Sequence, residues 1–311
     1  MDGDELSDAE RRVWAAMPAG ARAALAGLPA ADLRTLLLTV ARDRVARVRP
    51  ADVVRRWRED RFVRPAAVDP RALAAVEARM WRLLPADVDG VELSPVAPVG
   101  TCSAVAPVAQ NRIVTTMRAA EVLSDPTNAL AVEAATRRRN QPPTGEVHLA
   151  AAHRVLRAQD FGSGFSAHFR LFALVSSARD VGSGITEARL LVRHLAYWQT
   201  VLADLAPSAA PRLHVTVFDH PVIRERLTDT VRPALAADEV PLLDEPDRER
   251  GRGYYAGCAL RITALDGTLE LGDGGLTDWT ARLTGDAKER CLISCLATER
   301  LIACGGSAGG S

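Results

Sequence analysis

The stretch RGRGYYAGCALRI, residues 250–262, has two features that decide how the main part of this chain folds. Its second half joins Tyr254 and Tyr255 to a mostly apolar run next to glycines, which is typical of a buried β-strand. Its first half places arginines directly before that strand. A second apolar run, CLISCL at residues 291–296, also predicts a strand. We therefore expect the C-terminal part of the chain to form part of a β-sheet.

Upstream segments predict more strands and a few helices. The predicted strands are VELSPVAP (91–98), RIVTTMRAAEVL (112–123), EVHLAAAHRVL (146–156), HFRLFALVSS (168–177) and RLHVTVF (212–218). The predicted helices are RALAAVEARMWRLL (71–84), TNALAVEAATRRR (127–139) and ITEARLLVRHLAYWQTVLADL (185–205). Because the helices are few and irregularly placed, this order favours an α+β domain around a largely antiparallel sheet, at residues 69–304, over a doubly wound parallel sheet. The sequence contains no GxGxxG or GxxxxGK[ST] nucleotide loop.

The first 68 residues predict a separate helical region. Its predicted helices are DAERRVWAAM (8–17), AADLRTLLLTVARDRVARV (30–48) and ADVVRRWREDRF (51–62), with apolar residues at helical spacing. The arginines of this region can contact RNA or phosphate, but such a run more often forms the solvated face of a helix. The terminal GGSAGGS, residues 305–311, has the composition of a flexible tail or linker.

Composition excludes several classes of protein. Lys+Arg and Asp+Glu both number 39, so the net charge is zero and no overall basic field attracts a polyanion. No stretch approaches the roughly 20 apolar residues of a membrane span, and the acidic N-terminus does not look like a signal peptide. The five cysteines lack CxxC spacing, which argues against a disulfide framework and a zinc site. We expect a cytoplasmic protein with reduced thiols and no membrane association.

Three arginines stand in distinctive settings: Arg157 in HRVLRAQ, Arg250 in RERGRGYYAG and Arg300 in LATERL. Arginine suits phosphate because its planar fork donates several hydrogen bonds and stays charged at any relevant pH. These three residues are therefore candidates for binding a nucleotide.

The order of three separated motifs resembles a known family. RGRGYYAGCALRI (250–262), LGDGGLTDW (271–279) and LISCLATERLIA (292–303) resemble the C-terminal half of the histidyl-tRNA synthetase catalytic domain. The positions that match its motifs are Arg250, Gly251, Tyr254, Tyr255, Gly257, Gly274, Gly275, Asp278, Glu299, Arg300 and Leu301. HRVLRAQDFGSGFSAHFRLFALV (153–175) resembles the second signature of class II aminoacyl-tRNA synthetases, with Arg157, Gln159 and Phe169 on its arginine, glutamate and phenylalanine.

The resemblance implies a class II synthetase-like antiparallel sheet flanked by helices, with ATP and Mg²⁺ as cofactors. Arg157 and Arg250 would act on the reacting phosphate as catalytic residues. Phe169 and Arg300 would sandwich the adenine, with Gln159 and Glu299 also contacting ATP. Glu187 would help to hold magnesium, although a carboxylate in the first turn of a helix explains it equally well. The family forms homodimers through its first motif, here near VELSPVAP, so we expect a homodimer.

The substrate positions depart from the family. Tyr254, Tyr255, Gly274 and Gly275 match it, and Thr127 falls in SDPTNALAVEAA, the nearest counterpart of a substrate-binding turn. The glutamine and glutamate that hold histidine are replaced by Leu171 and Val175. We therefore expect a more apolar pocket and a substrate other than free histidine. For the glycine pair, a plain hairpin turn is an equally good interpretation.

Two functional classes remain open. The first is an ATP-dependent ligase that activates an amino acid or other small carboxylic acid as an adenylate, for transfer to an acceptor other than tRNA. The second is a non-catalytic regulatory or binding paralogue of histidyl-tRNA synthetase. The three arginines with Phe169 favour the ligase, and the lost amine contacts favour the regulator. The zero net charge and the end of the chain at the third motif make a tRNA partner unexpected.

Overall fold

The computed structural model of the chain describes residues 6–159, 166–235 and 240–305. Contacts divide the chain into two compact units, Met1–Glu59 with Thr115–Ala120, and Asp60–Val114 with Glu121–Ser311. All but the first residue of the predicted tail lies outside the described residues. No described helix is long and apolar enough to cross a membrane.

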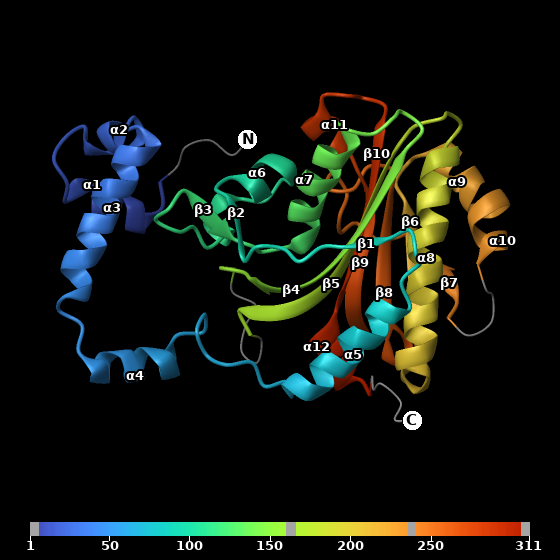
Figure 1. The fold of residues 1–311 in the computed structure, drawn as a ribbon, viewed down its shortest axis with the longest axis horizontal. Helices are drawn as coiled ribbons and strands as arrows, with labels where there is room; N and C mark the ends of the chain where they lie inside the picture. The colour runs from blue at the N-terminus through green and yellow to red at the C-terminus, as the bar shows by residue number, and fades with distance from the viewer. Residues whose placement is uncertain (1–5, 160–165, 236–239, 306–311) are drawn as a thin grey trace. The chain divides into compact units, whose positions relative to one another are not determined.

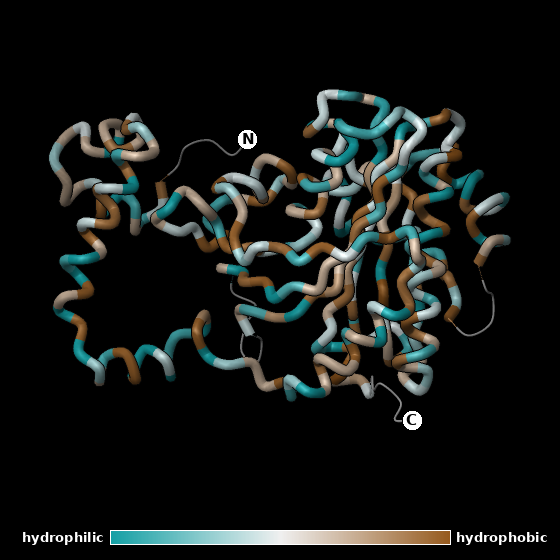
Figure 2. The backbone as a smooth tube through the Cα atoms, viewed as in Figure 1, coloured by the Kyte–Doolittle hydropathy of each residue, from teal (hydrophilic) through white to brown (hydrophobic). Residues whose placement is uncertain are grey.

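The N-terminal unit is helical, as the sequence predicts. Its helices are α1 (Asp8–Ala15), α2 (Ala21–Ala26), α3 (Ala30–Val45) and α4 (Pro50–Glu59). Ser7 and Glu10 form a capping box that starts α1, because each side chain accepts a hydrogen bond from the other residue's backbone N–H. None of these four helices has a buried residue. Hydrophobic and hydrophilic residues alternate along α3 and α4 (Figure 2), and the side chains of Val53, Val54 and Trp57 are more than half exposed.

The second unit is built on one eight-stranded sheet with the order β1-β4-β5-β10-β9-β8-β6-β7 (Figure 1). The strands are β1 (Asp89–Gly90), β4 (Glu146–Leu156), β5 (His168–Arg179), β6 (Arg212–Val217), β7 (Leu242–Asp244), β8 (Cys258–Ala264), β9 (Leu269–Thr277) and β10 (Glu289–Ala297). The six inner strands pair antiparallel, whereas the edge strands β1 and β7 pair parallel. The predicted α+β class with a largely antiparallel sheet is therefore confirmed.

One face of the sheet is covered by α8 (Ile185–Leu205), with α5 (Pro70–Arg82) and α9 (Pro221–Arg226) beside it. Trp198 and Leu202 of α8 are fully buried against Phe172 of β5 and Leu292 of β10. Gly184, with φ at 68°, gives the left-handed turn from which α8 starts. The apolar stripe of α8 thus forms the larger of the two cores.

The other face carries α7 (Pro126–Arg138), α6 (Thr101–Val105) and α11 (Trp279–Thr284). Leu130 and Trp279 pack here against Leu149, Val175 and Ile293 of the strands. The remaining elements are α10 (Arg232–Ala234), α12 (Thr298–Ala303), β2 (Val96–Pro98) paired with β3 (Ala120–Val122), the 3-10 turns Gln110–Arg112, Pro207–Ala209 and Leu265–Gly267, and the π-helical turn Leu227–Val231.

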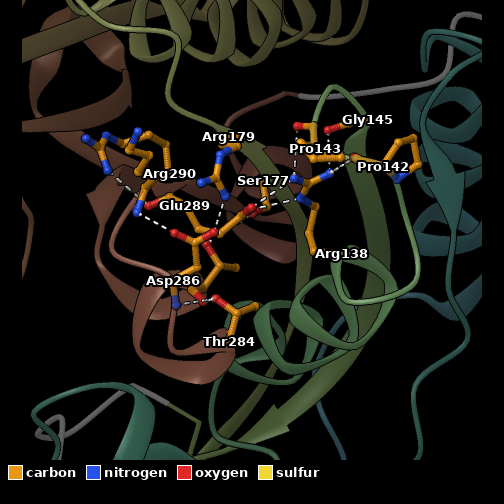
Figure 3. A network of polar contacts seen from close by, with 12 residues as sticks. Arg138, Pro142, Pro143, Gly145, Ser177, Arg179, Thr284, Asp286, Glu289 and Arg290 are labelled. Carbon is orange, nitrogen blue, oxygen red and sulfur yellow. Dashed lines mark hydrogen bonds and ion pairs between the residues drawn. The ribbon is translucent and has the colours of Figure 1, made fainter.

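A buried ion pair ties α7 to β10 (Figure 3). Arg138 donates to both carboxylate oxygens of Glu289, at 3.0 and 2.8 Å, and the two side chains are 3% and 5% exposed. The Ser177 hydroxyl donates to the same carboxylate at 3.1 Å, and Arg138 also donates to the carbonyl of Gly145. Because every charged group in the network is hydrogen-bonded, burial of this pair does not leave an uncompensated charge.

Three segments differ from the predictions. The strands expected over 91–98 and 112–123 shrink to three residues each in β2 and β3. Proline limits the first, and Ala119, with φ at 55°, breaks the second. The interpretation of Gly274 and Gly275 as a hairpin turn is wrong, because both residues lie within β9, which pairs with β8 and β10. Neighbouring strands hold this segment extended despite its weak strand propensity.

Candidate functional site

The site begins where β4 ends and β5 starts, on the α7 face of the sheet. Val155 pairs with Phe169 in the antiparallel register, and the backbone N–H of Arg157 donates to the carbonyl of Ala167. This register brings Arg157 to Phe169, with its guanidinium carbon 5.2 Å from the ring centroid. Such a distance is within the range of a cation–π contact. The structure thus brings together the predicted arginine and phenylalanine of the second signature.

Asp125, the N-cap of α7, holds both Arg157 and Thr127. Arg157 Nε donates to the carbonyl of Ser124 at 2.8 Å, and its Nη2 lies 3.4 Å from Asp125 Oδ2. Asp125 Oδ1 accepts the backbone N–H of Thr127 at 2.9 Å and its hydroxyl at 2.7 Å. Thr127 is 1% exposed. Its hydroxyl is therefore engaged in starting the helix.

Tyr254 and Tyr255 lie before β8 on this same face. Their rings meet edge to face with centroids 4.9 Å apart, and Tyr254 meets Trp279 in the same way at 5.7 Å. A Cβ on Gly275 would come within 2.5 Å of Tyr255 Cδ1, and one on Gly251 within 2.8 Å of its Cδ2. Glycine at these positions therefore makes room for the Tyr255 ring.

Asp273 is a residue on this face of the sheet that the sequence did not lead us to expect in the candidate site. It lies opposite Cys295 in the β9–β10 register, and Cys295 lies opposite Ala173 of β5. Burial raises the pKa of Asp273, and the charges of Asp125 and Glu270 raise it further. The segment LGDGGLTDW did contain a signal, because an acidic residue directly before two glycines is unusual in a buried strand.

A second group of charges lies at the start of β9. Arg250 Nη1 is 3.2 Å from both carboxylate oxygens of Glu270, and Arg300 Nη1 donates to the backbone carbonyl of Glu270 at 2.8 Å. Glu299 pairs with Arg154 at 2.7 Å. Two of the predicted arginines thus meet at one residue. Arg157, by contrast, contacts Ser124 and Asp125 at the start of α7.

Other predicted site residues lie apart from these two groups. Leu171 and Val175, 4% and 1% exposed, are packed into the core beneath α7. Gly274 is enclosed by β10, since a Cβ on it would meet Ile293 O at 2.4 Å. The backbone carbonyl of Gln159 accepts a hydrogen bond from Arg61 at 2.8 Å.

Glu187 lies in the first turn of α8, on the opposite face of the sheet from Arg157. Its Oε1 accepts from Arg290 Nε at 2.7 Å. Over residues 6–159, 166–235 and 240–305, no three His, Cys, Asp or Glu side chains group as metal ligands. The Glu187 carboxylate, which pairs with Arg290 on the other face of the sheet, does not fit a magnesium site beside Arg157. We therefore derive no step through a metal held by the protein.

Solved structures share this fold. A structure described as an ATP phosphoribosyltransferase regulatory subunit/histidyl-tRNA synthetase from Bacillus halodurans superposes with a TM-score of 0.60 and 11% identity, over 78% of this chain and 82% of that one. The fold is that of histidyl-tRNA synthetase. The synthetase of Nostoc sp. PCC 7120 gives a TM-score of 0.60 and 13% identity, over 78% of this chain and 74% of its own. Apo S. aureus histidyl-tRNA synthetase gives 0.59 and 12%, over 79% and 68%.

No protein-family profile and no curated protein match the sequence. The likeness to histidyl-tRNA synthetase at 11–13% identity therefore establishes a shared fold. It confirms the class II synthetase-like architecture expected from the motifs. The chemistry of this chain has to be argued from its own side chains.

Proposed function

We propose that the chain is an ATP-dependent, adenylate-forming ligase that activates an amino acid or another small carboxylic acid for transfer to an acceptor other than tRNA. The observation that carries this proposal is the placement of Arg157 over Phe169, beside Asp125 at the start of α7. An aromatic ring next to a guanidinium suits a purine base with its phosphates. The Arg157 and Phe169 side chains are partly exposed, so a ligand can reach them.

The reaction would begin with attack of a carboxylate oxygen on the α-phosphorus of ATP. A new P–O bond forms as the bond to pyrophosphate breaks, and pyrophosphate leaves with the electron pair. Negative charge grows on the α-phosphate oxygens, where Arg157 would donate hydrogen bonds. ATP would arrive as its magnesium complex.

Arg250 would act with Arg157 on the reacting phosphate. The Arg250 side chain is 73% exposed, and its contacts with Glu270 are 3.2 Å long. An exposed ion pair of this kind is weak and exchanges readily for a more highly charged partner. Arg300 would keep the role expected for it, stacking on the adenine from the side opposite Phe169.

ATP–pyrophosphate exchange over a panel of amino acids and other carboxylic acids tests this proposal. Replacing Arg157 by alanine should lower the exchange rate by about two to three decades, because one transition-state contact contributes roughly 3 to 4 kcal/mol. Arg250→Ala should act in the same direction, and Arg157→Lys should restore only part of the rate. Arg79→Ala, which breaks a surface pair with Asp204, is the matched control and should leave exchange unchanged.

A regulatory paralogue is the second candidate, favoured by one observation. Arg157 already donates to Ser124 O and contacts Asp125, and a purely structural arginine would be placed in the same way. The Bacillus halodurans structure that shares this fold is described as a regulatory subunit/histidyl-tRNA synthetase, which supports this candidate. If no acid supports exchange while ATP measurably binds, the ligase is wrong and the regulator is favoured.

A further inference from the structure

A line of hydrogen bonds connects α8 with three strands of the sheet beneath it. His194 of α8 contacts the Ser294 hydroxyl of β10 through Nδ1, at 2.8 Å, and the Ser176 hydroxyl of β5 through Nε2, at 2.9 Å. The Ser176 hydroxyl also contacts His148 Nδ1 of β4, at 2.9 Å. These four side chains are buried. With a further residue at each end, they form the line that we call the α8 relay: Trp198, Ser294, His194, Ser176, His148 and Glu146.

The two ends of the α8 relay fix the direction in which its hydrogen bonds point. At one end, the Trp198 indole can only donate, and it donates to Ser294 Oγ at 2.8 Å. At the other end, the Glu146 carboxylate, which also pairs with Arg189, accepts from His148 Nε2 at 3.1 Å. A donor at the first end and an acceptor at the second therefore determine the roles of the groups between them.

A neutral His148 determines the tautomer of His194. With its proton on Nε2, His148 accepts the Ser176 O–H at Nδ1. Ser176 then accepts from His194 Nε2–H, and His194 Nδ1 accepts the Ser294 O–H. Every donor in the relay has one acceptor in this arrangement. We therefore assign the Nε2–H tautomer to both histidines.

A proton added to His148 reverses these roles. A charged imidazole donates from both ring nitrogens, so Ser176 must accept at His148 Nδ1. The Ser176 O–H then points to His194 Nε2, and the His194 proton moves to Nδ1. Ser294 now accepts from both His194 and Trp198, and over residues 6–159, 166–235 and 240–305 these are its two side-chain contacts. One proton gained at His148 thus leaves the buried Ser294 O–H without an acceptor.

The charges around the two histidines decide which ring takes up the proton. Burial lowers the pKa of His148, and the charge of Arg193 on α8 lowers it further. Glu146 on β4 and Asp87 before β1 oppose this shift. Burial lowers the pKa of His194 well below its usual value, and the neighbouring His148 and Arg193 add to the effect. Because Glu146 lies against it, His148 takes up the first proton.

We propose that the α8 relay is a pH-sensitive switch, in which protonation of His148 reverses the hydrogen bonds as far as Ser294 and weakens the attachment of α8 to β10. Ser176 passes the change from β4 to α8. Since the native pKa of His148 lies below its usual value, α8 is held firmly at neutral pH and less firmly as the pH falls through that pKa. The switch belongs to the fold and does not depend on the proposed function.

Nitrogen NMR of the full chain, labelled in its histidine rings, tests the assignment, because a ring nitrogen with a proton resonates far from one without. At pH 8 both histidines of the relay should carry the proton on Nε2. As the pH falls toward 5, His194 should change to the Nδ1–H form with the same midpoint as protonation of His148. The variants His148→Gln and His194→Gln assign the signals. A His194 ring that keeps one tautomer while His148 titrates would overturn the proposal, as would a folded protein in which neither ring responds.

Glu146→Gln moves the midpoint without removing a fully buried group. It deletes the negative charge beside His148, so the midpoint should fall by roughly one pH unit for both histidines. Glu133→Gln, which removes a surface carboxylate that pairs with Arg137 on α7, is the matched control and should leave the midpoint unchanged. A midpoint that moves for His148 alone would mean that the two rings are not coupled.

Ser176→Ala should uncouple the rings, because it removes the hydroxyl between them. His148 should still titrate, whereas the tautomer of His194 should no longer follow it. A His194 ring that still follows His148 in this variant would exclude Ser176 as the connection. If the variant does not fold, the comparison of Glu146→Gln with the parent protein still decides whether the rings are coupled.

Amide hydrogen exchange separates a local switch from general unfolding by acid. After correction for the intrinsic effect of pH, amides of α8 should exchange about tenfold faster once His148 is protonated, because a buried O–H has lost its acceptor. Amides of α7, which covers the opposite face of the sheet, should keep their rates. Equal acceleration in both helices would mean that the fold as a whole responds to acid, and would reject the switch.

Discussion

At the scale of single residues, Arg138 and Arg157 differ in how far they are buried and in how fully their donors are used. Arg138 is almost fully buried and meets Glu289 with two parallel hydrogen bonds. Arg157 is 29% exposed in its side chain and meets an aspartate at 3.4 Å. The first arrangement is closed, whereas the second leaves donor capacity for a ligand.

Arg138→Met should lower the free energy of unfolding by about 3 to 5 kcal/mol. The reason is that Glu289 would remain as a buried carboxylate held by one Ser177 hydroxyl. Urea unfolding followed by circular dichroism measures the loss. The double variant Arg138→Met, Glu289→Met should recover much of it, since both charges are then gone. A single variant as stable as the parent would contradict this account of the pair.

At the scale of elements, the regular segments were predictable and the pairing-dependent ones were not. The predicted bounds of β4 (146–156) and α8 (185–205) agree with the structure at every residue, because their apolar periodicity is unbroken. β9 was missed as a strand because its GDGG core has little strand propensity and is held extended by β8 and β10. The candidate site likewise contains residues that local sequence could place and residues that only strand pairing could place. Arg157 and Phe169 could be paired from the sequence, whereas the position of Asp273 opposite Cys295 depends on the register of β9.

Buried histidines between α8 and the sheet make the stability of the fold depend on pH. His194 is hydrogen-bonded to the hydroxyls of Ser294 at 2.8 Å and Ser176 at 2.9 Å, and His148 meets Ser176 at 2.9 Å. Burial lowers the pKa of His194 well below its usual value, and the neighbouring His148 and Arg193 lower it further. Burial also lowers the pKa of His148. The native state therefore keeps these rings neutral at a pH where the unfolded chain protonates them.

The unfolding free energy should accordingly be highest above the unfolded histidine pKa of about 6.5 and fall as the pH drops below it. Each extra proton bound by the unfolded chain makes the slope about 1.4 kcal/mol per pH unit. Urea midpoints between pH 5 and pH 8 measure this slope. His194→Gln should be less stable at pH 8 but show a shallower slope. An equal slope in both proteins would mean that other groups control the acid response.

At the scale of the whole molecule, we predict a symmetric homodimer at micromolar concentration, formed near residues 91–98. Light scattering of the full chain should give twice the mass of 33.3 kDa. Substituting glutamate for Val96, which is 38% exposed on β2, should shift the protein to the monomer by burying a charge in the interface. A parent protein that scatters as a monomer would exclude this interface.

The two edge strands of the eight-stranded sheet determine whether copies of the protein can pair edge to edge. β1 has two residues and β7 has three, and each pairs parallel with its inner neighbour. Strands so short offer an incoming chain only a few unpaired N–H and C=O groups. The long strands, whose repeated addition would build a fibril, lie inside the sheet. Crowded solutions of the folded protein should therefore stay free of cross-β aggregates.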